Sequence, residues 1–263
     1  MTIVTRSASC SLLLPTEFFD EKLFKQPPPD EDEDSCPICY LRLPIDLDQI
    51  RYQSCCGKML CGGCVCAHTV AAADTEKFKC VFCRTEAPSS YEEDIERMKK
   101  RVEANDARAM YHLGSYYELG IRGLRQDHWM ALELYHKSAK LGHHFAHQNL
   151  SVCYQTGDIG EKDTRKAKYH GQLAAMAGNT HARHNLGCAE SNAGNMDRAF
   201  KHWMISANDG FDVSMKAVQE GYEIGFVTKD DYAKTIRAYD NSIAEMKSDD
   251  RDRYAAACLS RAE

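Results

Sequence analysis

Nine of the thirteen cysteines in this 263-residue chain fall within forty-eight residues, between Cys36 and Cys83. A secreted disulfide scaffold usually spreads its cysteines through the fold and follows a leader peptide. Here the apolar run near the start, Leu12–Leu14, is far shorter than the ~7–15 residues of a secretory core. We therefore expect an intracellular protein, cytoplasmic or nuclear, whose cysteine cluster binds metal. Organelle import stays open, because the start is rich in serine and threonine and has no acid before Glu17.

The cluster contains three Cys-x-x-Cys pairs: Cys36/Cys39, Cys61/Cys64 and Cys80/Cys83. A gap of two residues lets both sulfurs of a tight turn reach one ion at ~2.3 Å, while backbone amides hydrogen-bond the thiolates. Three pairs supply six sulfurs, and two tetrahedral sites need eight. Cys55 and Cys56 supply the other two. Long gaps on both sides of this short central group predict two interleaved sites.

The order of the ligands resembles a RING-type zinc finger, in Cys36-Pro37-Ile38-Cys39, Cys61-Gly62-Gly63-Cys64 and Cys80-Val81-Phe82-Cys83-Arg84. The resemblance implies cross-bracing, in which the first and third ligand pairs share one zinc and the second and fourth share another. It implies a first site of Cys36, Cys39, Cys61 and Cys64, and a second site of Cys55, Cys56, Cys80 and Cys83. Zinc held by four cysteines has no open position, so two structural Zn²⁺ ions are expected, with no catalytic role.

The chain departs from the common RING pattern at the fourth ligand, where histidine is usual. Lys58 stands nearby and is a poor ligand, but the all-cysteine variety has a cysteine five positions before the third pair, where Cys56 lies. Two rival ligands follow Cys64. We interpret Cys66 as a small buried or half-buried thiol, and His68 remains an alternative to Cys55.

Many RING domains are ubiquitin ligases that bind a charged ubiquitin-conjugating enzyme and form no covalent intermediate of their own. The resemblance implies that Ile38 contacts this enzyme from the first pair, Val81 and Phe82 contact it from the last pair, and Arg84 bridges it to ubiquitin. Ile38 is equally explained as a core residue and Arg84 as a solvated one, and the proline common after the seventh ligand is absent. The chain is thus expected to be a RING-type E3 ubiquitin ligase. The alternative is a non-catalytic scaffold with a structural zinc module.

The second half of the chain repeats itself at intervals of 32 to 37 residues. Four columns of small and apolar residues align: Ala109, Ala146, Ala182 and Ser214; Leu113, Leu150, Leu186 and Val218; Ala131, Ala167, Ala199 and Ala233; Ala139, Ala175 and Ala207 with Gly142, Gly178 and Gly210 three residues later. Alanine lets two helices approach closely, and a glycine after a helix suits a left-handed cap. The pattern predicts stacked helical hairpins, the first formed by helices at about 106–119 and 127–141.

The first three units resemble Sel1-like repeats: Ala109 to Gly142, Ala146 to Gly178, and Ala182 to Gly210. The fourth unit, from about Asp212, keeps fewer of the columns and is expected to cap the stack. Sel1-like repeats are adaptor scaffolds that hold other proteins. The resemblance therefore implies that this part of the chain binds a protein substrate or partner.

We expect a mainly α protein in which a small cross-braced, zinc-binding RING-like module precedes an α-solenoid of Sel1-like hairpins. The expected segments are a disordered acidic region at 1–35, the RING-type finger at 36–88, a linker helix at 89–104, the solenoid at 105–246 and a charged tail at 247–263. The net charge of −6 argues against nucleic-acid binding. No apolar run approaches the ~18 residues that span a bilayer, so no membrane partner is expected.

Histidines at helical spacing offer a further candidate metal site: His143, His144 and His147, and His181 with His184. They lack nearby cysteines and dense carboxylates, so we interpret them as exposed or packing residues. The isolated cysteines are expected to be small buried hydrophobes. These are Cys153, Cys188 and Cys258.

Overall fold

The computed structural model describes residues 22–25, 35–71, 78–158 and 162–253. The first part contains η1 Leu47–Gln49, β1 Ile50–Tyr52, β2 Met59–Cys61, α2 Gly62–Ala71 and α3 Tyr91–Glu103. The second part contains α4 Ala107–Leu119, α5 His128–Lys140, α6 His144–Thr156, α7 Thr164–Met176, α8 Thr180–Asn192, α9 Met196–Asn208, α10 Asp212–Glu223 and α11 Lys229–Met246. Within the described ranges, no helix combines the length and apolarity needed to cross a membrane.

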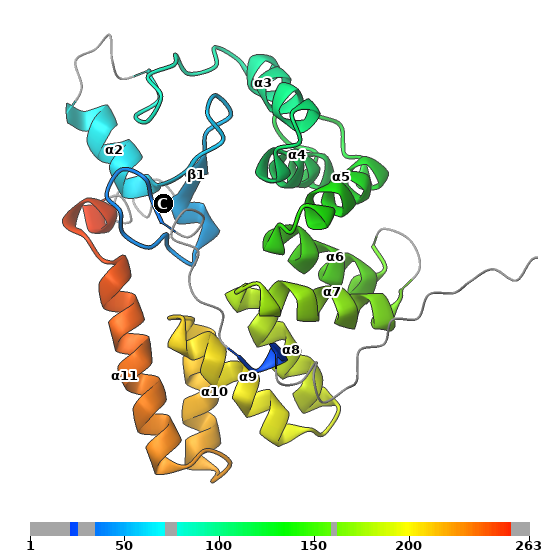
Figure 1. Cartoon of the computed structure of the whole chain (residues 1–263), viewed down its shortest axis with the longest axis vertical. Coiled ribbons are helices and arrows are strands. Elements are labelled where there is room, and N and C mark those ends of the chain that lie inside the picture. Colours follow the sequence, from blue (N-terminus) through cyan, green and yellow to red (C-terminus); the bar gives the residue numbers. More distant parts are fainter. Residues whose placement is uncertain (1–21, 26–34, 72–77, 159–161, 254–263) are drawn as a thin grey trace, which may run out of the picture.

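The predicted helical hairpins are confirmed. Helices α4 and α5 form the first, and α6/α7, α8/α9 and α10/α11 follow in a stack. Figure 1 shows these helices following a curve, from α3 round to α11, which returns toward the cysteine-containing part of the chain. We call that part the cysteine module (described residues 35–71 and 78–88).

The aligned columns of the repeat form the core between the helices. The first column is at most 1% exposed at Ala109, Ala146, Ala182 and Ser214. The second column is also buried, at Leu113, Leu150, Leu186 and Val218. The glycines that follow α5, α7 and α9 have left-handed φ angles of 89°, 89° and 95°, at Gly142, Gly178 and Gly210. A side chain would be strained in that conformation, which explains the recurrent glycine.

Within each of the first three hairpins, a small residue on one helix faces its counterpart on the other. The pairs are Gly114 with Tyr135, Ser151 with Gly171, and Gly187 with Trp203. In the first and third pairs the second helix supplies the aromatic ring, and a Cβ added at Gly187 would overlap the indole of Trp203. In the second pair the glycine lies on the second helix. The three hairpins therefore pack closely by complementary side-chain size.

The cysteine module is fastened to the start of the solenoid through α3. Arg101 donates from Nε to the carbonyl oxygen of Ser54 at 2.8 Å and from Nη2 to that of Cys55 at 3.2 Å. It also forms an ion pair with Asp106, the N-cap residue of α4, at 2.8 Å. One guanidinium thus ties the loop that carries Cys55 to the first repeat.

The end of the chain also reaches the cysteine module. Arg251 lies in a short helix at 249–253 and is only 4% exposed. Its guanidinium donates to the carbonyl oxygens of Leu41, Arg42 and Met246. The backbone of Arg251 also packs on Gly63 in α2, where an added Cβ would lie 2.7 Å from the Arg251 amide nitrogen. Figure 1 shows this terminal helix beside the module, so the solenoid contacts the module at both of its ends.

Several expectations fall on residues outside the described ranges. These include the proline run, the acidic run Asp30–Asp34, Cys258 and the tail beyond Arg253. The described part of the N-terminal region, residues 22–25, includes one helical turn. Its Leu23 is fully buried against α7 and α8.

Candidate metal centre

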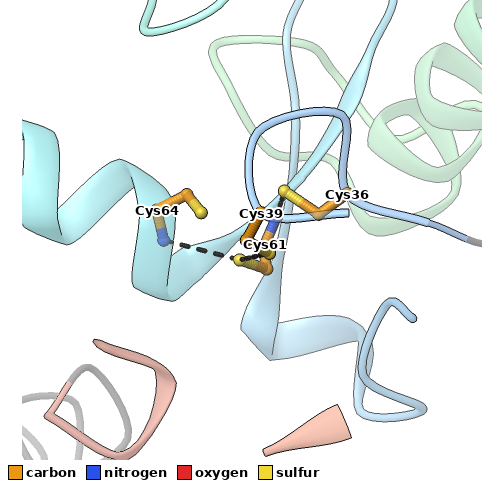
Figure 2. Close-up of side chains that lie close together, drawn as sticks. All are labelled: Cys36, Cys39, Cys61 and Cys64. Atoms are coloured by element: carbon orange, nitrogen blue, oxygen red, sulfur yellow. Dashed lines mark hydrogen bonds between the residues drawn. The ribbon is translucent and has the colours of Figure 1, made fainter. Parts of the chain in front are cut away.

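The first cysteine group joins the loop after Ser35 to β2 and α2. Cys36 and Cys39 lie in the loop, Cys61 ends β2 and Cys64 lies in the first turn of α2. All four sulfurs lie within 4.8 Å of one another, and Figure 2 shows their side chains converging. The Sγ atoms of Cys39 and Cys61 are 3.9 Å apart. Four sulfurs at ~2.3 Å from one ion in a tetrahedron would be about 3.8 Å apart, which matches this spacing.

Backbone amides point at two sulfurs of this group. The amide of Cys61 donates to Cys36 Sγ at 3.5 Å, and the amide of Cys64 donates to Cys61 Sγ at 3.4 Å, drawn as dashed lines in Figure 2. The second bond closes the Cys-x-x-Cys turn on itself. Such bonds stabilise negative charge on sulfur, which a metal-binding thiolate carries.

The second cysteine group joins a loop between β1 and β2 to the turn before α3. Its members are Cys55, Cys56, Cys80 and Cys83, with all sulfurs within 4.8 Å of one another. Cys56 Sγ lies 3.9 Å from Cys80 Sγ, and Cys83 Sγ lies 3.4 Å from Cys55 Sγ. Pairs one and three therefore share one group and pairs two and four share the other. The expected cross-bracing is confirmed in the fold.

The rival ligands lie in neither group. Among the described residues, only these two cysteine groups bring three or more His, Cys, Asp or Glu side chains close enough together to hold a metal ion. Cys66 and His68 are half-buried on α2 and belong to neither. Cys55 is a member of the second group. The histidines of the repeats also form no such group, and His143 is buried against the ring of Tyr111.

The outer Cys-x-x-Cys pairs have the same backbone conformation. The amide of Tyr40 donates to the Cys36 carbonyl at 2.8 Å, and the amide of Arg84 donates to the Cys80 carbonyl at 2.9 Å. Tyr40 and Arg84 both have left-handed φ angles, 58° and 62°. Each pair is thus a tight knuckle that ends in a strained non-glycine residue. The strain is retained where the turn is held from outside, as by a bound ion.

The chemistry of the two groups fits a divalent cation. Burial raises the pKa of Cys64 to about 12 and that of Cys56 to about 11, and repulsion from neighbouring thiolates adds to both shifts. The hydrogen bond with Cys61 instead lowers the pKa of Cys36 to about 4. Cysteine binds metal only as the thiolate. A cation supplies the positive charge that lets all four sulfurs lose their protons, so metal binding and proton release are linked.

The structure places the candidate docking residues on the outer knuckles. Ile38 and Val81 are half-buried and pack on the same cluster, which includes Leu60. Phe82 is 42% exposed, and the ammonium of Lys58 lies 5.9 Å from its ring centre. Arg84 is exposed. The two knuckles therefore adjoin, with apolar side chains below and an aromatic ring and a cation at the surface.

Sequence reasoning missed the arginines that contact the two cysteine groups from outside. Arg251 comes from the charged tail, and its Nη2 lies 3.6 Å from Cys39 Sγ. Arg101 supports the second group through the carbonyl of Cys55. Neither residue lies in a motif. Only the chain path brings position 251 to position 39, so no local signal was available to find it.

A cavity of about 600 Å³ lies between the module and the concave row of helices α4, α6 and α8. Its walls include Leu43 and Ile45 from the module side, and Tyr111, His112 and His181 from the repeats. Burial lowers the pKa of His112 to about 4, so this histidine is neutral near pH 7. On its solenoid side the cavity thus combines aromatic rings with two arginines, Arg108 and Arg122.

Comparison with known families identifies the repeats. The family model described as "Sel1 repeat" matches residues 107–143 and 144–179. Two solved structures share the fold: a Sel1 repeat protein from Oxalobacter formigenes and the antigen c5321 of uropathogenic Escherichia coli with an SLR fold. The first is 21% identical to this chain with a TM-score of 0.50, and the match covers 62% of this chain and 68% of the Oxalobacter chain. The second is 22% identical to this chain with a TM-score of 0.51, and the match covers 64% of this chain and 37% of the antigen.

The fold and the cysteine groups thus define an α-solenoid that contains Sel1 repeats at residues 107–179 and is joined to a cross-braced cysteine module. Two curated proteins match short stretches. Chitin synthase regulatory factor 3 of Schizosaccharomyces pombe is 38% identical over 58 residues, which is 22% of this chain. The ERAD-associated E3 ubiquitin-protein ligase component HRD3A of Arabidopsis thaliana is 33% identical over 66 residues, which is 25% of this chain. The matches span only 6% and 10% of the lengths of these relatives.

Proposed function

We propose that the cysteine module is a RING-type finger with two structural Zn²⁺ ions, one held by each cysteine group. Four thiolates fill the tetrahedral coordination of zinc and leave no position for water or substrate. Each ion therefore supplies only folding, by holding one outer knuckle to another part of the module: Cys36 and Cys39 to Cys61 and Cys64, and Cys80 and Cys83 to Cys55 and Cys56. Any activity then belongs to the surface that the knuckles form.

We propose that this surface recruits a ubiquitin-conjugating enzyme, which makes the protein an E3 ubiquitin ligase. The observation that carries the proposal is the joining of the two knuckles: Ile38 and Val81 pack on one cluster while Phe82 and Arg84 face solvent. An apolar patch beside an exposed cation is suited to a protein partner with an apolar loop and an acidic rim. The chain would hold the enzyme and orient its thioester, and no residue here would bond to ubiquitin.

The solenoid is the proposed substrate-binding part. Stacked helical hairpins present one continuous curved surface to a partner. The similarity to a protein named as an E3 ubiquitin-protein ligase component supports a role beside ubiquitin transfer, although it covers a quarter of this chain. The contacts of Arg251 and Arg101 hold the two parts together, so a substrate on the repeats would stay at a fixed distance from the knuckles.

Self-ubiquitination with a panel of conjugating enzymes tests the proposal. Phe82→Ala should reduce chain formation about tenfold or more, because docking energy concentrates in a few exposed aromatic anchors. The matched control is Leu47→Ala, since Leu47 is also an apolar side chain of the module and is 42% exposed like Phe82. Ile38→Ala should also reduce transfer, with both ions retained by native mass spectrometry.

A panel in which the wild-type chain transfers no ubiquitin would overturn the ligase proposal. The alternative is a non-catalytic scaffold, in which the module and the solenoid both bind proteins. That alternative predicts stable partners in affinity capture and no conjugating enzyme among them. The zinc assignment is tested separately, by the metal-to-protein ratio.

A further inference from the structure

A short stretch of the N-terminal region occupies a pocket on the solenoid. Leu23 is fully buried among side chains of α7 and α8. It packs against Ala174, Ala175, Ala182 and Leu186. Burying a leucine completely removes its whole apolar side chain from water, which stabilises the contact. The pocket (walls from α7, α8 and α9) is therefore an apolar site that already holds a peptide.

A buried arginine donates a hydrogen bond to the backbone of that peptide. Arg183 in α8 is 2% exposed and donates from Nη1 to the carbonyl oxygen of Leu23. Its Nη2 donates to the carbonyl of Ala175 at 2.6 Å. Burial lowers the pKa of Arg183 to about 10, so the guanidinium is still charged at pH 7. Without the peptide, this buried charge would lose an acceptor, and leaving a buried charged donor unpaired is unfavourable.

The next residue of the peptide lies on α9. The ring of Phe24 packs on the imidazole of His202, with ring centres 4.7 Å apart. The guanidinium of Arg198 and the ammonium of Lys201 lie 5.0 and 5.7 Å from the Phe24 ring centre. Arg198 is held by the buried Glu190 at 3.3 Å. These two cations favour an aromatic side chain at this position, because cations are attracted to the face of an aromatic ring.

The pocket differs from the corresponding places in the other repeats. The repeat register puts Met110, His147 and Met215 at the positions equivalent to Arg183. A second difference lies in the floor of the pocket. Ser138 and Ser206 donate to carbonyl oxygens of Ala107 and Thr180, whereas the equivalent residue here is Ala174, which contacts Leu23 instead. One repeat junction therefore combines an apolar floor with a charged backbone clamp.

We propose that this pocket is a peptide-recognition site that binds a leucine followed by an aromatic residue, and that Leu23–Phe24 is a resident ligand which a partner peptide of the same kind displaces. The partner is an extended segment of another protein that carries this pair. The inference deepens the proposed substrate-binding role of the solenoid. It depends on that proposed function only for what the pocket is used for. The pocket itself stands on the contacts of Leu23, Phe24 and Arg183.

The covalent link to the resident ligand sets how strongly a partner must bind. Residues 26–34 connect it to the module. A ligand on a short link competes at an effective concentration of roughly millimolar. A free peptide that binds the empty pocket with micromolar affinity would then bind the wild-type chain about a thousandfold more weakly. A partner must therefore bind the pocket more tightly than the resident ligand, or reach a high local concentration, to displace it.

Fluorescence anisotropy with a labelled peptide of residues 17–30 tests the inference in the full-length chain. We expect tight binding to the variant Leu23→Asp/Phe24→Asp and binding about a thousandfold weaker to the wild type. Adding Arg183→Met to the released variant should remove most of this affinity. Equal, weak binding to the wild-type and released chains would overturn the inference, as would tight binding that survives Arg183→Met.

The controls separate the site from stability and from ligase activity. Lys201→Ala on the surface of α9 should weaken the peptide several-fold in the released chain, whereas Lys216→Ala on α10 should not. Circular dichroism checks folding. If the double variant unfolds, Phe24→Ala alone repeats the comparison. Peptide binding needs no conjugating enzyme. If no conjugating enzyme in the panel supported ubiquitin transfer but the peptide still bound, only the ligase proposal would be overturned.

Discussion

The cysteine module and the solenoid are stabilised in opposite ways. Within the described module, the buried hydrophobic side chains are four cysteines with Ile50 and Leu60. In the solenoid, buried alanine and leucine recur in the first three hairpins, and the fourth buries Ser214, Val218 and Val227. So small a core stabilises little by itself, and ions that bind only the folded chain would supply the rest. Stability in the module is concentrated at two points, whereas in the solenoid it is spread along the stack.

The largest expected effect is the loss of one metal site. Cys55→Ser should lower the metal-to-protein ratio from two to one by native mass spectrometry and unfold much of the module, because structural zinc contributes ~10–16 kcal/mol of apparent binding free energy. The control is Cys66→Ser, since Cys66 belongs to neither cysteine group. Helicity should change little, because the helices of the repeats lie outside the module. A second ion retained in Cys55→Ser would contradict this assignment.

The solenoid should respond to a core substitution without losing metal. Leu150 in α6 is fully buried, and Leu150→Ala is expected to lower the free energy of unfolding by ~2–5 kcal/mol. Val152→Ala on the same helix should cost much less, since Val152 is 39% exposed. Urea unfolding followed by circular dichroism measures both. If Leu150→Ala also released the ions, the two parts would not be stabilised independently.

The contact of Arg251 with the module tests how far the two parts are coupled. Arg251→Met keeps the length of the side chain and leaves the carbonyls of Leu41 and Arg42 without this donor, so we expect a loss of ~1–3 kcal/mol. Hydrogen exchange should then quicken at residues 35–42 while α6 is unchanged. Arg253→Met is the control, because Arg253 is exposed and pairs with Asp250 in the same short helix.

What could be predicted from the sequence is what recurs or has fixed spacing. The alanine and leucine columns predicted the hairpins because burial repeats with the helical period. The Cys-x-x-Cys spacing and the RING resemblance predicted how the cysteines group. Arg251 and Leu23 could not be predicted in this way. Each contacts residues more than 150 positions away in the sequence, and does so only once, so no repeating sequence pattern indicates the contact.

The smallest expected effect lies at the joint between the two regions. The ring of His112 in α4 packs on Tyr52 of the module and on Tyr111, with ring centres 4.5 and 5.0 Å apart. Burial lowers its pKa from 6.5 to about 4; the nearby Asp106 raises it and Arg108 lowers it further, both to a lesser extent. The unfolded chain therefore binds a proton below pH 6.5 that the folded chain does not bind until about pH 4.

Stability contributed by neutral His112 is consequently complete above pH 6.5 and is lost as the pH falls toward 4. Between pH 7.5 and 5.5 the loss is about 1 kcal/mol. Urea unfolding of the wild-type chain and of His112→Gln at both values measures it, with the ion count checked at pH 5.5. The glutamine variant should lose about 1 kcal/mol less than the wild type over this interval. An identical pH dependence in the two chains would mean that the joint does not exclude water from His112, and that the module and the solenoid touch there without forming a common core.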